Sequence, residues 1–167
     1  VSGSVVSAVL EGTRPLLVEI QALVSRANFG YSARRAQGFD YNRLSLLIAV
    51  LEKKIGLHLE TEDVFLNIAG GVKVVDPACD LAVVIAIASS FKDKPILEET
   101  VVFGEVGLTS EVRSINQVHL RVNEADKLGF KRCVLPKNNL KNTEIKKSRL
   151  ELIGVGSVKE ALDVLFS

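Results

Sequence analysis

An unbroken apolar stretch, residues 81–88, constrains the fold of this chain more than any other part of its sequence. It follows the pair Asp76-Pro77, and a proline just behind a capping residue is typical of a helix start. A helix without a polar face has to be covered by other elements on all sides. The stretch is too short to span a membrane, which takes about 18 apolar residues. The sequence therefore predicts a globular fold built around one buried helix.

The composition is that of one globular domain. The 167 residues are 47% hydrophobic and 25% charged, so we expect a single domain over residues 1–167 with a full core. Its two cysteines, Cys79 and Cys133, support neither a zinc motif nor a disulfide framework, which favours a reducing, cytoplasmic setting. The sequence shows no signal peptide and no membrane span, so we expect a protein that is neither secreted nor inserted in a bilayer.

Strand and turn signals dominate the first forty residues. Residues 5–10 and 16–24 are rich in branched apolar side chains, and the turn formers at residues 12–15 separate them. This pattern predicts a β-hairpin. A third strand, interrupted by Gly38, is expected over residues 33–39.

Helices and strands alternate after that point. Asp40 stands where a helix N-cap belongs, and apolar residues then recur every three or four positions up to Gly56, a residue typical of a helix end. The remaining strands are expected at residues 64–68, 101–103, 106–108, 133–135 and 150–155, and the remaining helices at residues 118–128 and after Ser157. A hairpin group followed by alternating elements predicts an α+β fold with a mixed sheet rather than a doubly wound parallel one.

Residues 76–82, 104–108 and 113–121 resemble, in this order, the proteolytic domain of the Lon proteases. In that family a nucleophilic serine follows a proline at a helix start, and a lysine base lies on a later helix; the matching positions here hold Ala78 and Arg121. The resemblance implies a two-layer α+β fold with a mixed sheet, related to the second domain of ribosomal protein S5. Alanine has no nucleophile and arginine stays protonated. A Lon-like domain without proteolytic activity is therefore implied.

Nearly the whole chain is similar to one family of bacterial DNA-repair proteins. Residues 11–24, 63–72 and 102–113 resemble the C-terminal domain of the RadA family, also called Sms. The resemblance implies a DNA repair and recombination ATPase of the branch-migration helicase class, in which a zinc motif and a RecA-like ATPase precede this region. Zinc, ATP and Mg are implied for those domains only, since residues 104–107 lack the lysine and third glycine of a phosphate-binding loop. The implied partners are double-stranded or branched DNA, a recombinase, and further copies of the chain in a hexameric ring.

No other residue restores a catalytic pair. A thiol at a helix start can have a lowered pKa, but Cys79 is turned by about 100° from the serine position, and residue 121 is not a lysine. We interpret Cys79 and Cys133 as core residues. A peptidase that uses Cys79 or an unrecognised residue is kept as a third hypothesis.

The remaining polar candidates are interpreted as structural. His58 and His119 have no acidic or serine partner at a recognisable spacing. Ser89 and Ser90 are expected to bond backbone carbonyls at the end of the buried helix. Asp80 is expected to be paired, to be solvated or to cap the free N–H groups of the first turn.

Positive charge is unevenly spread, although the net charge is only +1. Residues 131–149 hold seven basic residues against one acidic one. Six basic residues are expected to reach solvent and contact DNA phosphates: Arg34, Arg35, Lys92, Lys94, Lys131 and Arg132. With two tyrosines and no tryptophan for stacking, the sequence favours a sequence-independent grip on duplex DNA. The alternative is a purely structural oligomerisation module whose basic residues only keep it soluble.

Overall fold

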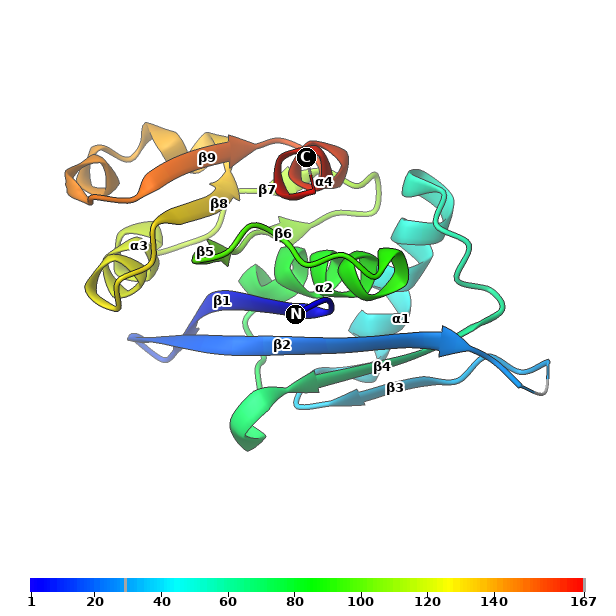
Figure 1. Ribbon diagram of the computed structural model, residues 1–167. Coiled ribbons are helices and arrows are strands. Elements are labelled where there is room, and N and C mark those ends of the chain that lie inside the picture. The colour runs from blue at the N-terminus through cyan, green and yellow to red at the C-terminus, as the bar shows by residue number, and fades with distance from the viewer. Residues whose placement is uncertain (29, 167) are drawn as a thin grey trace.

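The computed structural model describes residues 1–28 and 30–166, which form an α+β fold around one mixed sheet (Figure 1). The sheet order is β3-β4-β2-β1-β5-β8-β9. Its strands are β1 (Ser4–Glu11), β2 (Arg14–Arg26), β3 (Arg34–Gln37), β4 (Glu62–Ile68), β5 (Thr100–Val102), β8 (Arg132–Pro136) and β9 (Glu151–Val155). A separate antiparallel pair consists of β6 (Glu105–Val106) and β7 (Val112–Arg113). The predicted α+β class with a mixed sheet is confirmed.

Four α-helices occur in the described residues, and none of them is long and apolar enough to cross a bilayer. They are α1 (Tyr41–Val50), α2 (Asp80–Lys92), α3 (Val118–Lys127) and α4 (Val158–Leu165). A π-helical turn η1 (Leu51–Ile55) extends α1. The short 3-10 turns are η2 (Ala69–Gly71), η3 (Pro77–Cys79), η4 (Lys137–Lys141) and η5 (Thr143–Lys147).

The first two strands form the predicted hairpin, but with a shorter turn. Leu10 is paired with Pro15 and Glu11 with Arg14, so Pro15 belongs to the strand and not to the turn. Proline lacks an N–H group and normally weakens a sheet interior. It is tolerated here because β4 pairs with β2 only from Ile20 onward, which leaves this end of β2 without a neighbour on one side.

The sheet is covered on both faces over part of its width (Figure 1). Alternate residues of a strand point to opposite faces. Accordingly, Val5 and Val9 of β1 belong to the core shared with α1, α2 and α4, whereas Ala8 belongs to a second core under α3. The predicted two-layer arrangement holds for β3 and β4, while α3 adds a layer over β1, β5 and β8. Sequence periodicity could not predict this layer, because it does not say which face of a sheet a helix will cover.

Helix α2 is the predicted central helix. Its residues are buried from Asp80 to Ser89, and it packs against β1, β2, α1 and α4. The turn η3 leads into it, and the carboxylate of Asp76 caps this turn by accepting a hydrogen bond from the backbone N–H of Ala78 at 3.1 Å. The start of α2 is therefore fixed next to β1.

The other end of α2 is tied to the sheet through two serines. The hydroxyl of Ser89 accepts a hydrogen bond from the N–H of Gly3 at 2.8 Å and donates one to the carbonyl of Lys94. The hydroxyl of Ser90 accepts from the N–H of Val24 at 2.9 Å. The prediction that both serines bond carbonyls is thus right for Ser89 and wrong for Ser90. Strand β1 ends before it reaches Val24, so the N–H of that residue is free to bond the helix end.

The predicted ends of α1 and α4 are confirmed. Asp40 caps α1 by accepting a hydrogen bond from the N–H of Arg43 at 2.8 Å. The π turn that follows α1 ends at Gly56, whose φ of 83° is the left-handed conformation that favours glycine. Ser157 caps α4 through the N–H of Glu160 at 3.2 Å.

Candidate functional site

The two positions that correspond to a catalytic serine and lysine meet at one carboxylate. Asp76 Oδ1 accepts a hydrogen bond from the N–H of Ala78 at 3.1 Å. Asp76 Oδ2 accepts one from Arg121 Nη1 at 2.5 Å and one from the N–H of Leu10 at 2.9 Å. The structure therefore brings Ala78 and Arg121 together on either side of Asp76, which the sequence comparison did not identify. The only signal for Asp76 was its position directly before Pro77, which indicated a helix cap.

Arg121 is fully buried and all its contacts are internal. Besides Asp76, its guanidinium donates to the carbonyl of Ala8 at 3.0 Å, to the carbonyl of Asn116 at 3.1 Å and to Asn116 Oδ1 at 2.8 Å. A buried charge is tolerated when it is paired and its donors are satisfied. The burial of Arg121 among internal acceptors supports a structural role and not a DNA contact.

The pKa of Asp76 lies below its ordinary value. Burial by itself raises this pKa, but hydrogen bonds from Arg121 and from the N–H groups of Leu10 and Ala78 outweigh the effect of burial. Asp76 is therefore ionised at neutral pH and serves as the counter-ion of the buried guanidinium.

Of the roles expected for Asp80, the structure shows pairing, and its carboxylate does not cap the first turn. Its buried carboxylate accepts two hydrogen bonds from the guanidinium of Arg43 on α1 and one from the N–H of Val106 at 3.1 Å. The start of α2 has no need of a cap from the Asp80 side chain. The backbone N–H of Asp80 donates to the carbonyl of Pro77, and the N–H of Leu81 donates to the carbonyl of Gly104. Asp80 instead joins α2 to α1 and to β6.

The pKa values of Arg43 and Asp80, which form an ion pair, both differ from their ordinary values. Burial raises the pKa of Asp80 above its ordinary value, and the hydrogen bonds from Arg43 and Val106 oppose that effect. The hydrogen bond to Asp80 is the main cause that raises the pKa of Arg43. The pair thus links α1 to α2. Most of its desolvation cost falls on Asp80, because that side chain is fully buried while Arg43 is partly exposed.

The cysteines lie in the core, as predicted. Cys79 is fully buried, and burial raises the pKa of its thiol strongly, with the carboxylates of Asp80 and Asp76 adding to the effect. Burial likewise raises the pKa of Cys133. Thiols in this state are inert, since the thiolate is the nucleophile.

Neither histidine belongs to a catalytic arrangement. His58 is exposed and lies 4.0 Å from the carboxylate of Glu60, and His119 is half-buried on α3. Across the described residues, no group of three or more His, Cys, Asp and Glu side chains has the geometry of a metal site.

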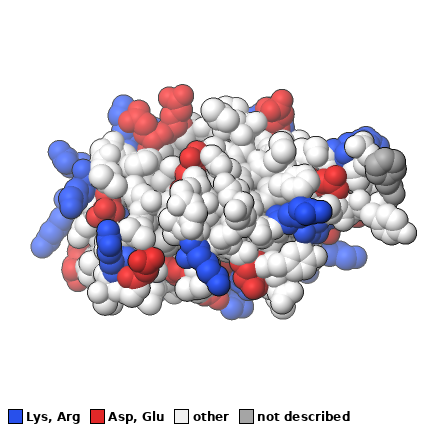
Figure 2. All heavy atoms as spheres, turned by 90° about the horizontal axis from the view of Figure 1, so that it is seen from below, with Lys and Arg blue, Asp and Glu red and all other residues white. Residues whose placement is uncertain are grey.

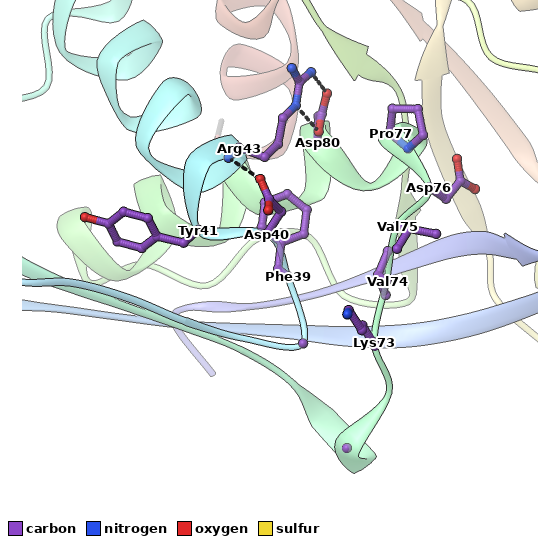
Figure 3. A pocket seen from close by; sticks show the side chains of 12 residues that line it. Phe39, Asp40, Tyr41, Arg43, Lys73, Val74, Val75, Asp76, Pro77 and Asp80 are labelled. Atoms are coloured by element: carbon purple, nitrogen blue, oxygen red, sulfur yellow. Dashed lines mark hydrogen bonds and ion pairs between the residues drawn. The ribbon is translucent and has the colours of Figure 1, made fainter.

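A cavity of about 800 Å³ opens beside the turn that carries Ala78 (Figure 3). One wall is the start of α1, where Arg43 reaches Asp80; the other is the segment 73–77 that leads into η3. The lining residues are Gly38, Phe39, Asp40, Tyr41, Arg43, Gly71, Lys73, Val74, Val75, Asp76, Pro77 and Asp80. This lining includes no serine, threonine, cysteine or histidine. The cavity therefore offers charged and apolar contacts but no serine, threonine or cysteine nucleophile.

The six predicted DNA contacts do not form one cluster. Arg34 and Arg35 lie on β3 at one end of the sheet, and Arg132 lies on β8, five strand positions away. At about 4.8 Å per strand this separates them by about 24 Å. Lys131 directly precedes Arg132, and Lys92 and Lys94 lie at the C-terminal end of α2.

The two adjacent arginines of β3 have opposite environments. The side chain of Arg34 is 15% exposed, and it donates to the carbonyls of Leu59 at 2.9 Å and Glu62 at 2.5 Å. It also lies 3.9 Å from the carboxylate of Glu52. Arg35 points to the other face of the sheet, is exposed, and has no hydrogen-bond or ion-pair partner within residues 1–28 and 30–166. Only Arg35 of this doublet is available for a ligand without rearrangement.

The other two basic doublets, Lys131-Arg132 and Lys92 with Lys94, differ in whether they pair with carboxylates. Lys131 lies 3.4 Å from Glu99, and Arg132 lies 3.6 Å from Glu151 and donates to the carbonyl of Glu98. Lys92 lies with its ammonium 5.9 Å from the centre of the Phe166 ring, and Lys94 is exposed. Lys92, Lys94 and Arg35 are therefore the candidates that do not engage a carboxylate in the described structure.

Comparison with known proteins places this geometry in a family. The family model described as "Subunit ChlI of Mg-chelatase" matches residues 44–139, which include the turn of Ala78 and the helix of Arg121. Proteins named "DNA repair protein RadA" are also similar. The chain is 51% identical over 164 residues to that of Halalkalibacterium halodurans, 54% over 161 to that of Bacillus subtilis, and 48% over 166 to that of Streptococcus pneumoniae.

These alignments cover 96% to 99% of this chain but only 35% to 39% of the relatives. The chain thus spans about a third of the length of the proteins it matches, and the activities of the whole relatives are not thereby assigned to it. The resemblance to RadA that the sequence indicated is confirmed. The chain belongs to the family of the ChlI model, and nearly its whole length is similar to part of the RadA proteins.

Proposed function

We propose that this chain is a Lon-like domain without proteolytic activity in a RadA-type DNA repair protein, where it assembles into a ring and holds DNA without reading its sequence. The observation that carries this proposal is the arrangement of Ala78, Asp76 and Arg121. A methyl group stands in the place of a nucleophile, and the neighbouring cation is buried and bound by four acceptors. The scaffold is retained while the catalytic groups are replaced.

Absence of peptidase activity is tested with casein and a fluorogenic peptide. We expect no turnover by the chain, because Cys79 is inert and Arg121 cannot act as a base at neutral pH. We also expect none from the double variant Ala78→Ser, Arg121→Lys, since Asp76 would pair with the new lysine and keep it protonated. Turnover by the unaltered chain that a thiol reagent abolishes would instead support the cysteine peptidase hypothesis.

The proposed DNA contacts are the six basic residues named from the sequence. Arg35, Lys92 and Lys94 are available as they stand, whereas Arg34, Lys131 and Arg132 would have to exchange a protein partner for a phosphate. Each phosphate contact releases counterions, so the logarithm of duplex affinity should fall with the logarithm of salt by about 0.9 per contact. Alanine variants of the doublets should weaken binding to a short duplex and reduce that slope. Unchanged affinity and slope would contradict the DNA-binding proposal.

A purely structural oligomerisation module remains the second candidate, because half of the basic residues in question, Arg34, Lys131 and Arg132, are bound to carbonyls or carboxylates of the protein. Light scattering with and without a short duplex separates the two. A ring that never takes up duplex supports the structural module, and a complex that dissociates as salt rises supports the DNA-holding domain.

The rest of the proposal concerns the longer protein. We place this domain behind a zinc motif and a RecA-like ATPase that uses ATP and Mg, in a cytoplasmic hexamer of the branch-migration helicase class that works with a recombinase on double-stranded or branched DNA. The identity to proteins named for DNA repair supports this setting. Purification of the longer protein, with and without this domain, tests the setting. DNA-stimulated ATP hydrolysis should require the region that precedes this domain, and it should persist at a reduced rate when this domain is removed.

A further inference from the structure

One face of the sheet carries two rows of side chains that no helix covers. In β4, Val64 and Leu66 point into the core, so Phe65 and Asn67 point outward. Strand pairing aligns Leu23 of β2 and Arg35 of β3 with Phe65, which makes the first row. The same pairing aligns Gln21 and Gln37 with Asn67, which makes the second row. We call these two rows the open sheet face.

The open sheet face is exposed and hollowed. Helices α1 and α2 pack against the opposite face of these strands, and within the described residues α3 reaches only the other end of β2. A hollow of about 760 Å³ lies over the two rows and is bounded at the β3 edge by Tyr41. Leu23 is 60% exposed and Tyr41 is 53% exposed. Figure 2 looks onto this side of the molecule and shows a largely uncharged surface with both basic and acidic groups spread over it.

The chemistry of the face combines three kinds of group. The ring of Phe65 lies between an apolar neighbour, Leu23, and a cation, Arg35, that has no protein partner within the described residues. The second row consists of amides, which both donate and accept hydrogen bonds. Neither row contains a carboxylate. Two acidic side chains follow along these strands and already accept hydrogen bonds: Asp63 from the N–H of Ala33 at 2.7 Å, and Glu19 from the hydroxyl of Ser4 and from the amide of Gln21 at 3.4 Å.

We infer that the open sheet face binds single-stranded DNA, with an unpaired base stacked on Phe65, a phosphate held by Arg35 and base edges bonded by the amide row. This inference rests on the proposed DNA-holding function. It adds to that function the form of DNA that is bound, a single strand, and the surface that binds it. An aromatic ring beside a free guanidinium on an open sheet suits unpaired bases, because every base has a face that can stack. In a duplex the bases are stacked on one another and cannot lie on Phe65.

This inference departs from one sequence-based expectation. The small number of tyrosines and the lack of tryptophan argued against stacking on single strands. The count of aromatic residues is less important than their placement, and Phe65 and Tyr41 both border the same hollow.

Fluorescence anisotropy of the chain with a labelled thymidine 15-mer and with a duplex of equal length tests the site. Phe65→Leu keeps the apolar bulk and removes the aromatic face, so we expect about tenfold weaker binding of the single strand and unchanged duplex affinity. Arg35→Gln should weaken single-strand binding and lower its salt slope by about 0.7. Lys159→Gln, on α4 and outside both the open sheet face and the six proposed DNA contacts, is the matched control and should leave single-strand affinity within twofold. Circular dichroism confirms that each variant is folded.

A second readout uses the lack of tryptophan in this chain. Phe65→Trp places a single tryptophan on the open sheet face, and its fluorescence should be quenched by the single strand and not by the duplex. Quenching by both DNA forms, or by neither, contradicts stacking at this position.

The outcomes separate this inference from the proposed function. If the chain binds duplex but Phe65→Leu leaves single-strand affinity within twofold, the open sheet face is not the single-strand site and the DNA-holding proposal stands. If the chain binds neither DNA form, both proposals fail. If instead a folded Phe65→Leu variant loses only self-association, the face is a protein interface and the inference is overturned.

Discussion

A single carboxylate explains how this chain keeps a charged side chain in its core. Asp76 receives donors from Leu10 in β1, from Ala78 in its own turn and from Arg121 in α3, three segments that are distant in sequence. The charge of Arg121 is thereby paired where solvent is excluded. The two positions that the Lon resemblance matches to a catalytic pair form a structural junction.

Replacing this carboxylate should be costly. Asp76→Asn removes the charge opposite a fully buried guanidinium, so we expect a loss of about 3 kcal/mol in the free energy of unfolding, measured with urea. The control is Asp163→Asn, which removes an exposed ion pair with Lys159 and should cost less than about 0.5 kcal/mol. Equal small effects of the two substitutions would contradict the role assigned to Asp76.

Among the elements, the β6–β7 hairpin contains a carboxyl group whose pKa is strongly lowered, that of Glu111. The hydroxyl of Thr109 is the main cause that lowers the pKa of Glu111 from 4.5 to about 2, with further contributions from backbone N–H groups and Arg113. Because this pKa is lower in the folded state than in the unfolded state, the stabilisation is present above pH 4.5. It is lost as the pH falls toward 2.

Removing the hydroxyl should move this titration. We expect Thr109→Val to raise the pKa of Glu111 toward 4.5, measured by carbon NMR of the side-chain carboxyl group. Thr109→Ser keeps a hydroxyl and is the matched control, with a pKa that should stay low. A titration that is the same in all three proteins would show that Thr109 does not hold the carboxylate.

The turn after β3 depends on a glycine that the sequence only marked as an interruption. Gly38 has a φ of +84°, and a Cβ there would lie 2.5 Å from the carbonyl oxygen of Val72 and 2.9 Å from Ile68 Cβ. We expect Gly38→Ala to lower the free energy of unfolding by about 3 kcal/mol through backbone strain and overlap. Gly56→Ala has a similar φ of +83° but no atom within 4 Å, so it should cost only about 1 kcal/mol. Equal losses would show that the overlap at Gly38 relaxes without cost.

At the scale of the whole molecule, the sheet consists of two parts, β3-β4-β2-β1 and β5-β8-β9. Strand pairing joins these parts weakly, and α2 joins them strongly. Strands β1 and β5 share one paired position, Val6 with Val101. Helix α2 packs against β1, β2 and β4 on one side and against β6 and α4 on the other. The prediction of one domain over residues 1–167 therefore depends on whether this helix makes the two parts unfold together.

Native-state hydrogen exchange measures that coupling. Because both parts share the buried face of α2, we expect the slowest amides of β2 and of β8 to exchange with the same free energy of opening. A markedly lower value for β8 and β9 would mean that the molecule consists of two separately unfolding units.

Local features of the sequence predicted most of the elements. The cap at Asp40, the helix end at Gly56 and the apolar stretch of α2 all depend on residues within one or two turns, so they are visible without a structure. The site was predicted in part: the resemblance located Ala78 and Arg121, but the carboxylate between them was interpreted only as a cap.

The amino-acid sequence by itself determined the elements and the buried central helix, because these depend on residue type and short-range spacing. Tertiary structure decided which side chains meet. The alternation of a strand places Arg34 and Arg35 on opposite faces, but only the pairing of β3 with β4 and the packing of α1 decide that Arg34 is bound internally and Arg35 is free. Such contacts join segments far apart in the chain, and their energies depend on burial, which exists only once the fold has formed.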